Sequence, residues 1–394
     1  MNTKGCMRTL TATAMAVLSA FSVQFGYAQN NPVASNGGAS APDDWLLTPK
    51  GPKWWYQTTP SPQPKALNVR AAKAAEQTII NEARTLMANR PAKAFALLDG
   101  DNVLHTEFKA PADSNSLFFG FSMGKTVTAM AVGQAICAGK LSLQTKASEL
   151  IPKLQGKALG EATVHDLLRM SSGTAQINAD STIWNKEQVQ DWRVGLLNLE
   201  DLIASDPVTQ AARGVFSAYK PGEVFAYKST DPLTLGIMVS RATNTPWNQW
   251  IQEQVLNPMG AAYAGLYVQD RAQNGLADSG MRLRLEDWMR FAVWVKESSK
   301  QQDCFADFVR TAMSKQIANG ATPATRKNGK LFASYGYLTW TDNDIAPNTA
   351  WAVGWGGQRI GWNKGNDRMV LIFSNEESWL GDAYVLAKNW GQLQ

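Results

Sequence analysis

Strand-like segments lie near both ends of this chain, and the stretch between them, from about residue 109 to 294, is mostly helical in pattern. Residues 94–98 and 103–108 flank a short Asp-Gly turn, which predicts a β-hairpin. Further short strands are expected around residues 331–340, 350–362 and 369–374, before a last helix over 381–389. Because such distant strands must meet to form a sheet, the order predicts one layered α/β domain of the α+β type.

Residues 1–28 have the features of a secretory signal peptide. Lys4 and Arg8 precede an apolar run over 9–21, and small residues fit a cleavage site after Ala28. The run is shorter than the roughly 20 residues of a membrane-spanning helix. We therefore expect a periplasmic or secreted protein with no transmembrane anchor after cleavage. An uncleaved anchor is the alternative.

Residues 29–65 form a distinct Pro-rich N-terminal arm. Its aromatic residues, among them Trp45, Trp54 and Trp55, favour a strap packed onto the body over a free linker. A helical period then extends over about residues 66–88. We expect the remaining chain, 66–394, to form a single domain.

Composition excludes several classes of protein. The chain has 394 residues, 44% hydrophobic and 18% charged, which excludes wholesale disorder and a multi-span membrane protein. Its formal net charge of +5 falls to +3 without the signal, because Lys4 and Arg8 leave and no acidic residue does. No Lys/Arg block with interleaved aromatic residues is present, so no nucleic-acid partner is expected.

Histidine and cysteine are scarce, with two and three residues respectively. A structural zinc site usually takes four Cys/His ligands, and haem or iron–sulfur groups need their own sets, so we expect no metal and no cofactor. Cys6 leaves with the signal. Cys137 and Cys304 could then form one disulfide in an oxidising compartment, or remain two buried thiols.

The stretch Ser122-Met-Gly-Lys125 precedes an apolar helix expected over 127–138. A serine and a lysine three residues apart at a helix start lie on one face. A desolvated lysine amine can take the serine proton, and the N–H groups of the helix start favour an oxyanion. The alternative is a helix-capping serine and a surface lysine.

Two other stretches could complete such a site. In the first, a Pro-Gly turn leads into a strand-like piece that ends on Tyr227, whose phenol could relay a proton. In the second, glycines interrupt a strand pattern over 354–362, which indicates close backbone approach, such as the approach to a ligand. The alternatives are a core tyrosine and a β-bulge.

In this order the three stretches resemble the serine β-lactamase and penicillin-binding-protein superfamily, and more closely its class C-like esterase and amidase branch. The resemblance covers about residues 66–394. Met-Ser-Ser-Gly at 170–173 and Arg290-Phe291 look most like the nylon-oligomer (aminohexanoate-dimer) hydrolases. The resemblance implies a β-lactamase/transpeptidase-like fold, with a mostly antiparallel sheet flanked by helices, a helical lobe, and the site between them.

The resemblance also implies roles for individual residues. Ser122 would be the nucleophile, Lys125 its general base and Tyr227 the second acid/base. The backbone N–H groups of Ser122 and Gln358 would hold the oxyanion. His105 and His165 match no part of the pattern, and we expect structural roles for both.

Two departures from the pattern concern the substrate. Trp355-Gly356-Gly357 stands where β-lactamases carry Lys or His followed by Thr-Gly, and so lacks the basic residue that helps bind the β-lactam carboxylate. Trp-Gly-Gly at this place is similar to β-lactamase-like esterases. Ser229 stands where the Tyr-x-Asn element carries its asparagine. We expect these four residues to line the substrate site.

We therefore expect a serine hydrolase that cleaves a small-molecule ester or small amide through an acyl-enzyme on Ser122. A β-lactamase or D-Ala-D-Ala carboxypeptidase is the first alternative, and a non-catalytic penicillin-recognising protein is the second. The sequence does not assign an oligomeric state.

Overall fold

A computed structural model describes residues 47, 55–174, 198–204, 220–326 and 329–393. The expected signal peptide, 1–28, lies outside the described residues, as does most of the arm, 29–65. None of the helices in these described ranges has the length and apolar character needed to cross a membrane.

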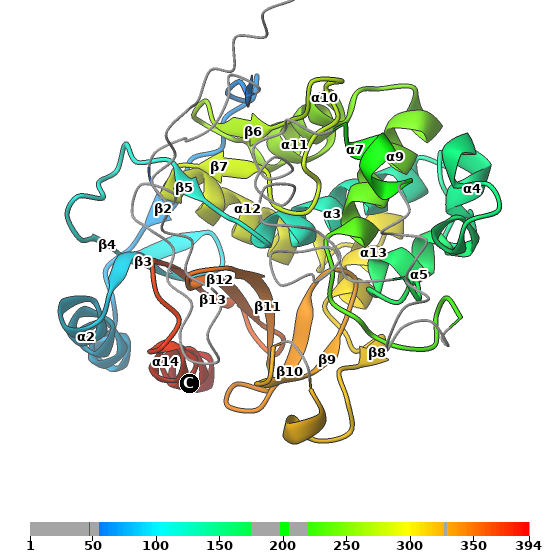
Figure 1. Ribbon diagram of the computed structural model, residues 1–394. Coiled ribbons are helices and arrows are strands. Elements are labelled where there is room, and N and C mark those ends of the chain that lie inside the picture. Colours follow the sequence, from blue (N-terminus) through cyan, green and yellow to red (C-terminus); the bar gives the residue numbers. More distant parts are fainter. Residues whose placement is uncertain (1–46, 48–54, 175–197, 205–219, 327–328, 394) are drawn as a thin grey trace, which may run out of the picture. The chain divides into compact units, whose positions relative to one another are not determined.

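The main element is a nine-stranded sheet (Figure 1). Its strands, in spatial order, are β2 (Asn68–Val69), β4 (Asn102–Phe108), β3 (Ala92–Asp99), β13 (Arg368–Ser374), β12 (Gln358–Asn363), β11 (Thr349–Gly354), β10 (Trp340–Asn343), β9 (Phe332–Tyr335) and β8 (Ile317–Ala318). Neighbours are antiparallel except β2 and β4. Strands from the two ends of the chain meet where Ala96 of β3 lies opposite Leu371 of β13. The expectation of a sheet formed by distant segments is confirmed.

A second sheet of four strands was not expected from the sequence. Its order is β1 (Trp55–Gln57), β6 (Leu266–Val268), β7 (Met281–Leu283) and β5 (Phe118–Phe119). Three of these strands interrupt the stretch expected to be mostly helical. With two or three residues each, they are too short to show an alternating pattern. β1 belongs to the end of the proline-rich arm, which is therefore tied into this sheet.

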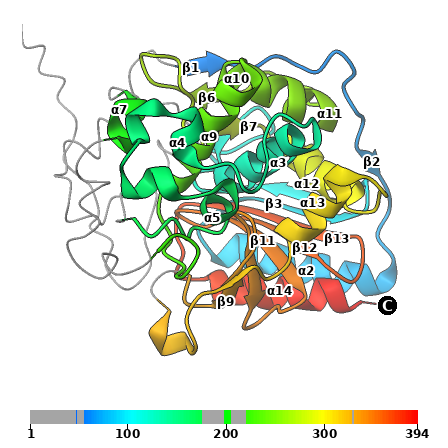
Figure 2. The same ribbon diagram turned by 90° about the vertical axis from the view of Figure 1, so that its right-hand side faces the viewer.

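Helices cover both faces of the large sheet (Figures 1 and 2). α2 (Ala74–Asn89) and α14 (Leu380–Gln392) lie together on one face. On the other face lie α3 (Met123–Cys137), α12 (Leu285–Ser298) and α13 (Cys304–Ala312). The expected helix over 66–88 in fact begins at Ala74, because the Glu76 side chain accepts a hydrogen bond from the Lys73 N–H at 2.8 Å and so caps the helix there.

The other helices, most of them short, form a lobe beside α3. They are α4 (Ala147–Leu150), η1 (Pro152–Leu154), η2 (Ala158–Glu161), α5 (Val164–Leu168), α7 (Leu199–Ile203), α9 (Thr230–Thr243), α10 (Trp247–Ile251), the π-helical turn η4 (Gln252–Leu256) and α11 (Asn257–Met259). A further 3₁₀ turn, η5 (Pro323–Thr325), precedes β9. The antiparallel sheet, covering helices and helical lobe agree with the fold implied by the resemblance.

A disulfide joins Cys137 at the end of α3 to Cys304 at the start of α13, with the Cα atoms 5.7 Å apart. This decides between the two alternatives for these cysteines. Along its length α3 is almost entirely buried, and Gly133 leaves room for the ring of Phe308 on α13. The helix that starts at Ser122 is thus fixed within the core and at its far end.

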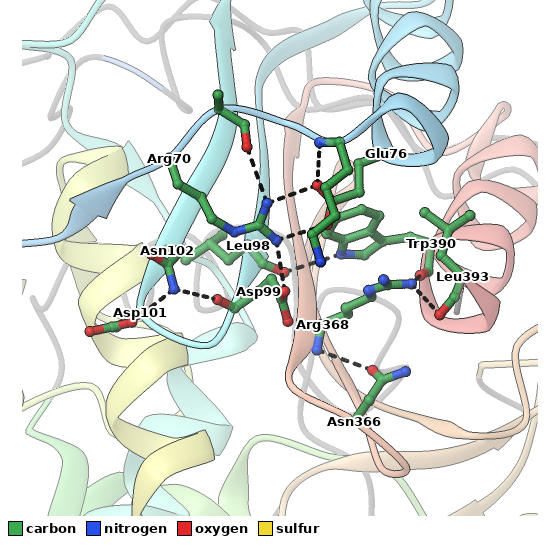
Figure 3. A network of polar contacts seen from close by, with 12 residues as sticks. Arg70, Glu76, Leu98, Asp99, Asp101, Asn102, Asn366, Arg368, Trp390 and Leu393 are labelled. Carbon is green, nitrogen blue, oxygen red and sulfur yellow. Dashed lines mark hydrogen bonds and ion pairs between the residues drawn. The ribbon is translucent and has the colours of Figure 1, made fainter.

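Two arginines anchor the helices α2 and α14 to the sheet (Figure 3). Arg70 forms ion pairs with Glu76 at 2.7 Å and with Asp99 at 2.8 Å, which joins the start of α2 to the end of β3. The hydrogen bond from Arg70 lowers the pKa of Glu76 to about 2. Arg368 on β13 donates to the carbonyl oxygens of Trp390 and Leu393, the end of α14.

Candidate active site

Ser122 lies at the junction of β5 and α3. The preceding residue, Phe121, has a φ of 46°, which is unusual for a residue other than glycine. This left-handed residue turns the chain from the strand into the helix, and the Lys125 N–H donates to the Ser122 carbonyl at 3.1 Å. The partly exposed serine therefore lies on a tight turn that leads directly into the first turn of α3.

Lys125 contacts the serine directly. Its Nζ donates to Ser122 Oγ at 2.9 Å and to the Asp278 carbonyl oxygen at 3.1 Å. Asp278 Oδ2 lies 3.7 Å from the same nitrogen, and the lysine side chain is only 2% exposed. The approach is close because Gly124 packs against the backbone of Ser279, where a Cβ would meet the Ser279 Cα at 3.1 Å.

Asp278 was not found by sequence reasoning. It lies 153 residues from Lys125, and no spacing rule connects the two. In the structure it supplies both a carbonyl oxygen and a carboxylate to the lysine amine. An ammonium formed at this position would therefore have two oxygen partners.

The ring of Tyr227 lies near the lysine amine. The Lys125 Nζ is 5.1 Å from the centroid of the tyrosine ring. The ring stacks on Trp340, with centroids 5.3 Å apart and planes at 28°, and meets Tyr335 edge-on at 6.3 Å. Burial raises the pKa of Tyr335 well above its usual value, so this neighbour stays neutral. The structure thus brings together the three side chains expected to be catalytic.

A second buried lysine follows Tyr227 directly, and the sequence did not single it out. Lys228 is fully buried, with Nζ 3.5 Å from Asp231 Oδ2 and 3.1 Å from the Ala226 carbonyl oxygen. Asp231 also accepts a 2.6 Å hydrogen bond from the Ser172 hydroxyl. Ser229, expected to contact substrate, is 5% exposed and stands at the N-cap of α9.

The glycine-rich stretch is a hairpin turn between β11 and β12 and not a bulge within one strand. Gly354 pairs with Gln358, and Gly356 and Gly357 between them have φ values of 74° and 102°. These left-handed conformations require glycine. A Cβ on Gly354 would collide with the carbonyl oxygen of Gly120.

The hairpin turn therefore lies against the segment that precedes Ser122. The partly exposed Trp355 ring meets Phe121 edge-on, with centroids 5.4 Å apart. The Gln358 side chain is fully buried and bonds to the protein main chain. Its backbone N–H, proposed for the oxyanion, remains a prediction.

The two histidines have partners elsewhere. His105 on β4 bonds to Glu107 at 3.0 Å, and His165 on α5 meets the Tyr337 ring edge-on at 5.7 Å. Burial lowers the pKa of both. Among the described residues no cluster of three or more His, Cys, Asp or Glu side chains could hold a metal ion.

Comparison with curated proteins finds one relative. The chain is 28% identical to penicillin-binding protein 4 of Amycolatopsis lactamdurans over 180 residues, which is 43% of either chain. It thus spans less than half the length of this curated relative.

Three solved structures share the fold. A protein of Bacillus anthracis assigned as a 6-aminohexanoate-dimer hydrolase superposes with a TM-score of 0.66 at 14% identity, over 84% of this chain and 89% of that one. A β-lactamase/D-alanine carboxypeptidase from Pseudomonas syringae gives 0.57 at 17%, over 81% and 99%. An octameric penicillin-binding protein homologue from Pyrococcus abyssi gives 0.57 at 18%, over 79% and 75%.

The Beta-lactamase family model matches residues 79–393, which include Ser122, Lys125, Tyr227 and the β11–β12 hairpin. The match extends over most of the chain. The protein therefore belongs to the Beta-lactamase family, whose members are typically serine hydrolases.

Proposed function

We propose that this protein hydrolyses esters or small amides through an acyl-enzyme on Ser122. The observation that carries the proposal is the 2.9 Å contact between the buried Lys125 amine and the partly exposed Ser122 hydroxyl. A nucleophile and a base within hydrogen-bonding distance form the basic unit of covalent catalysis.

In the proposed first step Ser122 Oγ attacks the substrate carbonyl carbon, and its proton passes to the neutral amine of Lys125. The resulting ammonium has the carbonyl oxygen and the carboxylate of Asp278 as partners, at 3.1 and 3.7 Å. The developing oxyanion is held by the backbone N–H groups of Ser122 and Gln358. These interactions stabilise charge that appears only during the reaction.

In the proposed second step the leaving group departs with a proton that Tyr227 relays from Lys125. The 5.1 Å between the Lys125 Nζ and the ring centroid supports this relay. Water then attacks the ester of Ser122, its proton returns through the same groups, and the acid is released. Stacking on Trp340 limits the orientations that the phenol can adopt.

The hairpin turn supports a substrate that carries no carboxylate at this place. Trp355, with Phe121 beside it, places an aromatic surface next to Ser122. In the β-lactamases that the sequence resembles, the position of Trp355 carries a cationic residue. A carboxylate on the substrate would lack that cationic partner here. We therefore favour esters and small amides over β-lactams as substrates. The disulfide between Cys137 and Cys304 supports a periplasmic or secreted location, since disulfides persist in oxidising compartments.

The test is covalent labelling and hydrolysis by Ser122→Ala. The variant should lose fluorophosphonate labelling and all turnover of a short nitrophenyl ester, while Ser114→Ala, an exposed serine before β5, should keep both. Intact mass after incubation with esters and amides should show one acyl adduct on the parent protein. Full activity of Ser122→Ala would contradict the mechanism.

Faster turnover of a chromogenic cephalosporin than of the ester would replace the proposed substrate class with β-lactams. Absence of turnover and of any acyl adduct would favour the non-catalytic alternative.

A further inference from the structure

The side chain of Gln358 forms its hydrogen bonds with the main chain around the hairpin turn. Its Nε2 donates to the carbonyl oxygens of Trp355 at 2.8 Å and Ser374 at 2.7 Å. Its Oε1 accepts from the Ser374 N–H at 3.1 Å. One amide thus ties the turn to the end of β13.

The next residue, Arg359, holds the same turn. Its Nη1 donates to the carbonyl oxygens of Gly354 at 2.7 Å and of Gln358 at 2.8 Å. Its Nε donates to Tyr384 Oη at 2.9 Å, and its Nη2 lies 3.7 Å from Glu377 Oε1. The guanidinium is therefore linked both to the turn and to the α14 region.

A buried arginine is costly unless its charge and donors are matched. The Arg359 side chain is only 5% exposed. Burial opposes its charge, but the phenol of Tyr384 and the carboxylate of Glu377 leave its pKa above the usual value. The charge is therefore retained, and two of its bonds go to backbone carbonyls at the base of one turn.

Gln358 and Arg359 are consecutive residues of β12, so their side chains leave opposite faces of the sheet. Together they bind the carbonyls of three of the five residues from Gly354 to Gln358. The two glycines between have great conformational freedom in the absence of such contacts. The two side chains restrain the turn from both faces.

We propose that Gln358 and Arg359 are positioning residues whose side chains fix this hairpin turn beside Ser122, so that the Gln358 backbone N–H is placed to bind the oxyanion. The inference rests on the proposed function. Its structural basis is the turn's contact with Gly120 and Phe121, the two residues before Ser122. A catalytic donor must be held within about 0.5 Å to be effective.

Arg368 offers a matched control for Arg359. It too donates from Nη1 to two backbone carbonyls, those of Trp390 at 2.8 Å and Leu393 at 2.6 Å, but at the opposite end of β13 from Ser374 (Figure 3). Arg359→Met and Arg368→Met each remove an arginine that binds main-chain oxygens. They differ in whether those oxygens belong to the turn.

The experiment compares kcat and KM for an ester and for its thionoester, in which sulfur replaces the carbonyl oxygen. Loss of an oxyanion donor typically costs about 10²–10³-fold in kcat. We expect Arg359→Met to lower kcat for the ester by about 10²-fold with little change in KM. Its preference for the ester over the thionoester should shrink, because a displaced donor distinguishes oxygen from sulfur less well. Arg359→Lys should recover part of both quantities.

Arg368→Met should lower the melting temperature but keep the parent kcat and ester preference under conditions where it is folded. Gln358→Glu keeps the backbone N–H and removes the two hydrogen bonds that Nε2 donates. It should therefore lower kcat and the ester preference as Arg359→Met does. If Arg359→Met does not fold, the Gln358→Glu variant tests the positioning role instead.

Unchanged kcat and ester preference in the folded turn variants would overturn the inference, as would an equal loss in Arg368→Met. In either case an inactive Ser122→Ala would leave the proposed function standing. An active Ser122→Ala would remove that function itself, whatever the turn variants do.

Discussion

Two buried lysines near Tyr227 make a useful pair. Lys125 is 2% exposed and Lys228 fully buried, and each has a carboxylate oxygen 3.5–3.7 Å from its Nζ, from Asp278 and Asp231 respectively. Both also donate to a backbone carbonyl. They differ in their third contact, since only Lys125 reaches the hydroxyl of a serine that is open to solvent.

The comparison teaches that burial and a charged partner do not by themselves make a lysine catalytic. At the second lysine, burial lowers the pKa of Lys228 and raises that of Asp231, because both charges are unfavourable away from water. Their pairing offsets that cost. The hydroxyl of Ser172 bonds to Asp231 and not to the lysine. Lys228 therefore pairs with a carboxylate of its own segment, which in turn bonds to Ser172, while Lys125 is placed for proton transfer.

Replacing Lys125 should have the largest effect. Lys125→Met removes the proposed base, and we expect kcat/KM for an ester to fall by about 10³-fold or more, within the range for loss of a general base. Steady-state kinetics, with circular dichroism to verify folding, make the measurement. Near-normal turnover would show that Lys125, like Lys228, is not needed for catalysis.

Replacing Lys228 should affect stability first. Lys228→Met leaves the Asp231 carboxylate buried without its cation, which typically costs about 3–5 kcal/mol in the free energy of unfolding. Adding Asp231→Asn should recover most of that loss, because the amide oxygen still accepts from Ser172. Urea denaturation measures both. If folded Lys228→Met lost as much activity as Lys125→Met, the distinction between the two lysines would fail.

The disulfide at the end of α3 tests whether the position of Lys125 depends on a distant part of the same helix. Cys137 and Cys304 are 167 residues apart, and breaking a native disulfide that closes a long loop typically costs about 2–5 kcal/mol. Cys137→Ser with Cys304→Ser should lower the free energy of unfolding by such an amount. Because the start of α3 is held by Asp278 and Ser279, kcat at low temperature should persist. A parallel loss of kcat in fully folded protein would show that Lys125 depends on this distant tether.

The smallest effect concerns His165, a partly buried titratable group whose ring meets that of Tyr337 edge-on. Burial, with Arg169 nearby, lowers its pKa from 6.5 in the folded protein, so the unfolded chain binds more protons. Its contribution to stability is therefore present above pH 6.5 and lost as pH falls below it. His165→Gln should flatten this part of the stability–pH curve and leave kcat nearly unchanged. Urea denaturation at several pH values tests the first expectation and an ester assay the second. A large loss of kcat would indicate that His165 takes part in the reaction.

The sequence predicted best what depends on local spacing. Ser122 and Lys125 are three residues apart at a helix start, and their contact follows from helix geometry. Tyr227 was a candidate from its Pro-Gly turn and strand-like piece, but its role beside the lysine came from the family resemblance, since nothing local brings the two together. The partners Asp278 and Asp231–Ser172 depend on contacts across 153 and 59 residues, which no periodicity encodes.

The strands show the same limit. The long strands β3, β4 and β13 have apolar patterns and were predicted. The short strands β5, β6 and β7 depend on pairing with one another and with β1. In the 350–362 stretch the glycines at 356 and 357 were the available sign of a turn. Their left-handed φ values show that the stretch contains two strands and a hairpin where one glycine-interrupted strand was expected.

The pairing of β3 with β13 has a consequence for folding. Residues such as Ala96 and Leu371 become neighbours only after almost the whole chain is available. Closing so long a stretch of chain slows folding, and until then the edge of the early hairpin is unpaired and open to other strands. A growing chain would therefore carry an incomplete sheet, and also an incomplete active site, until the segment with the β11–β12 hairpin and β13 has been made.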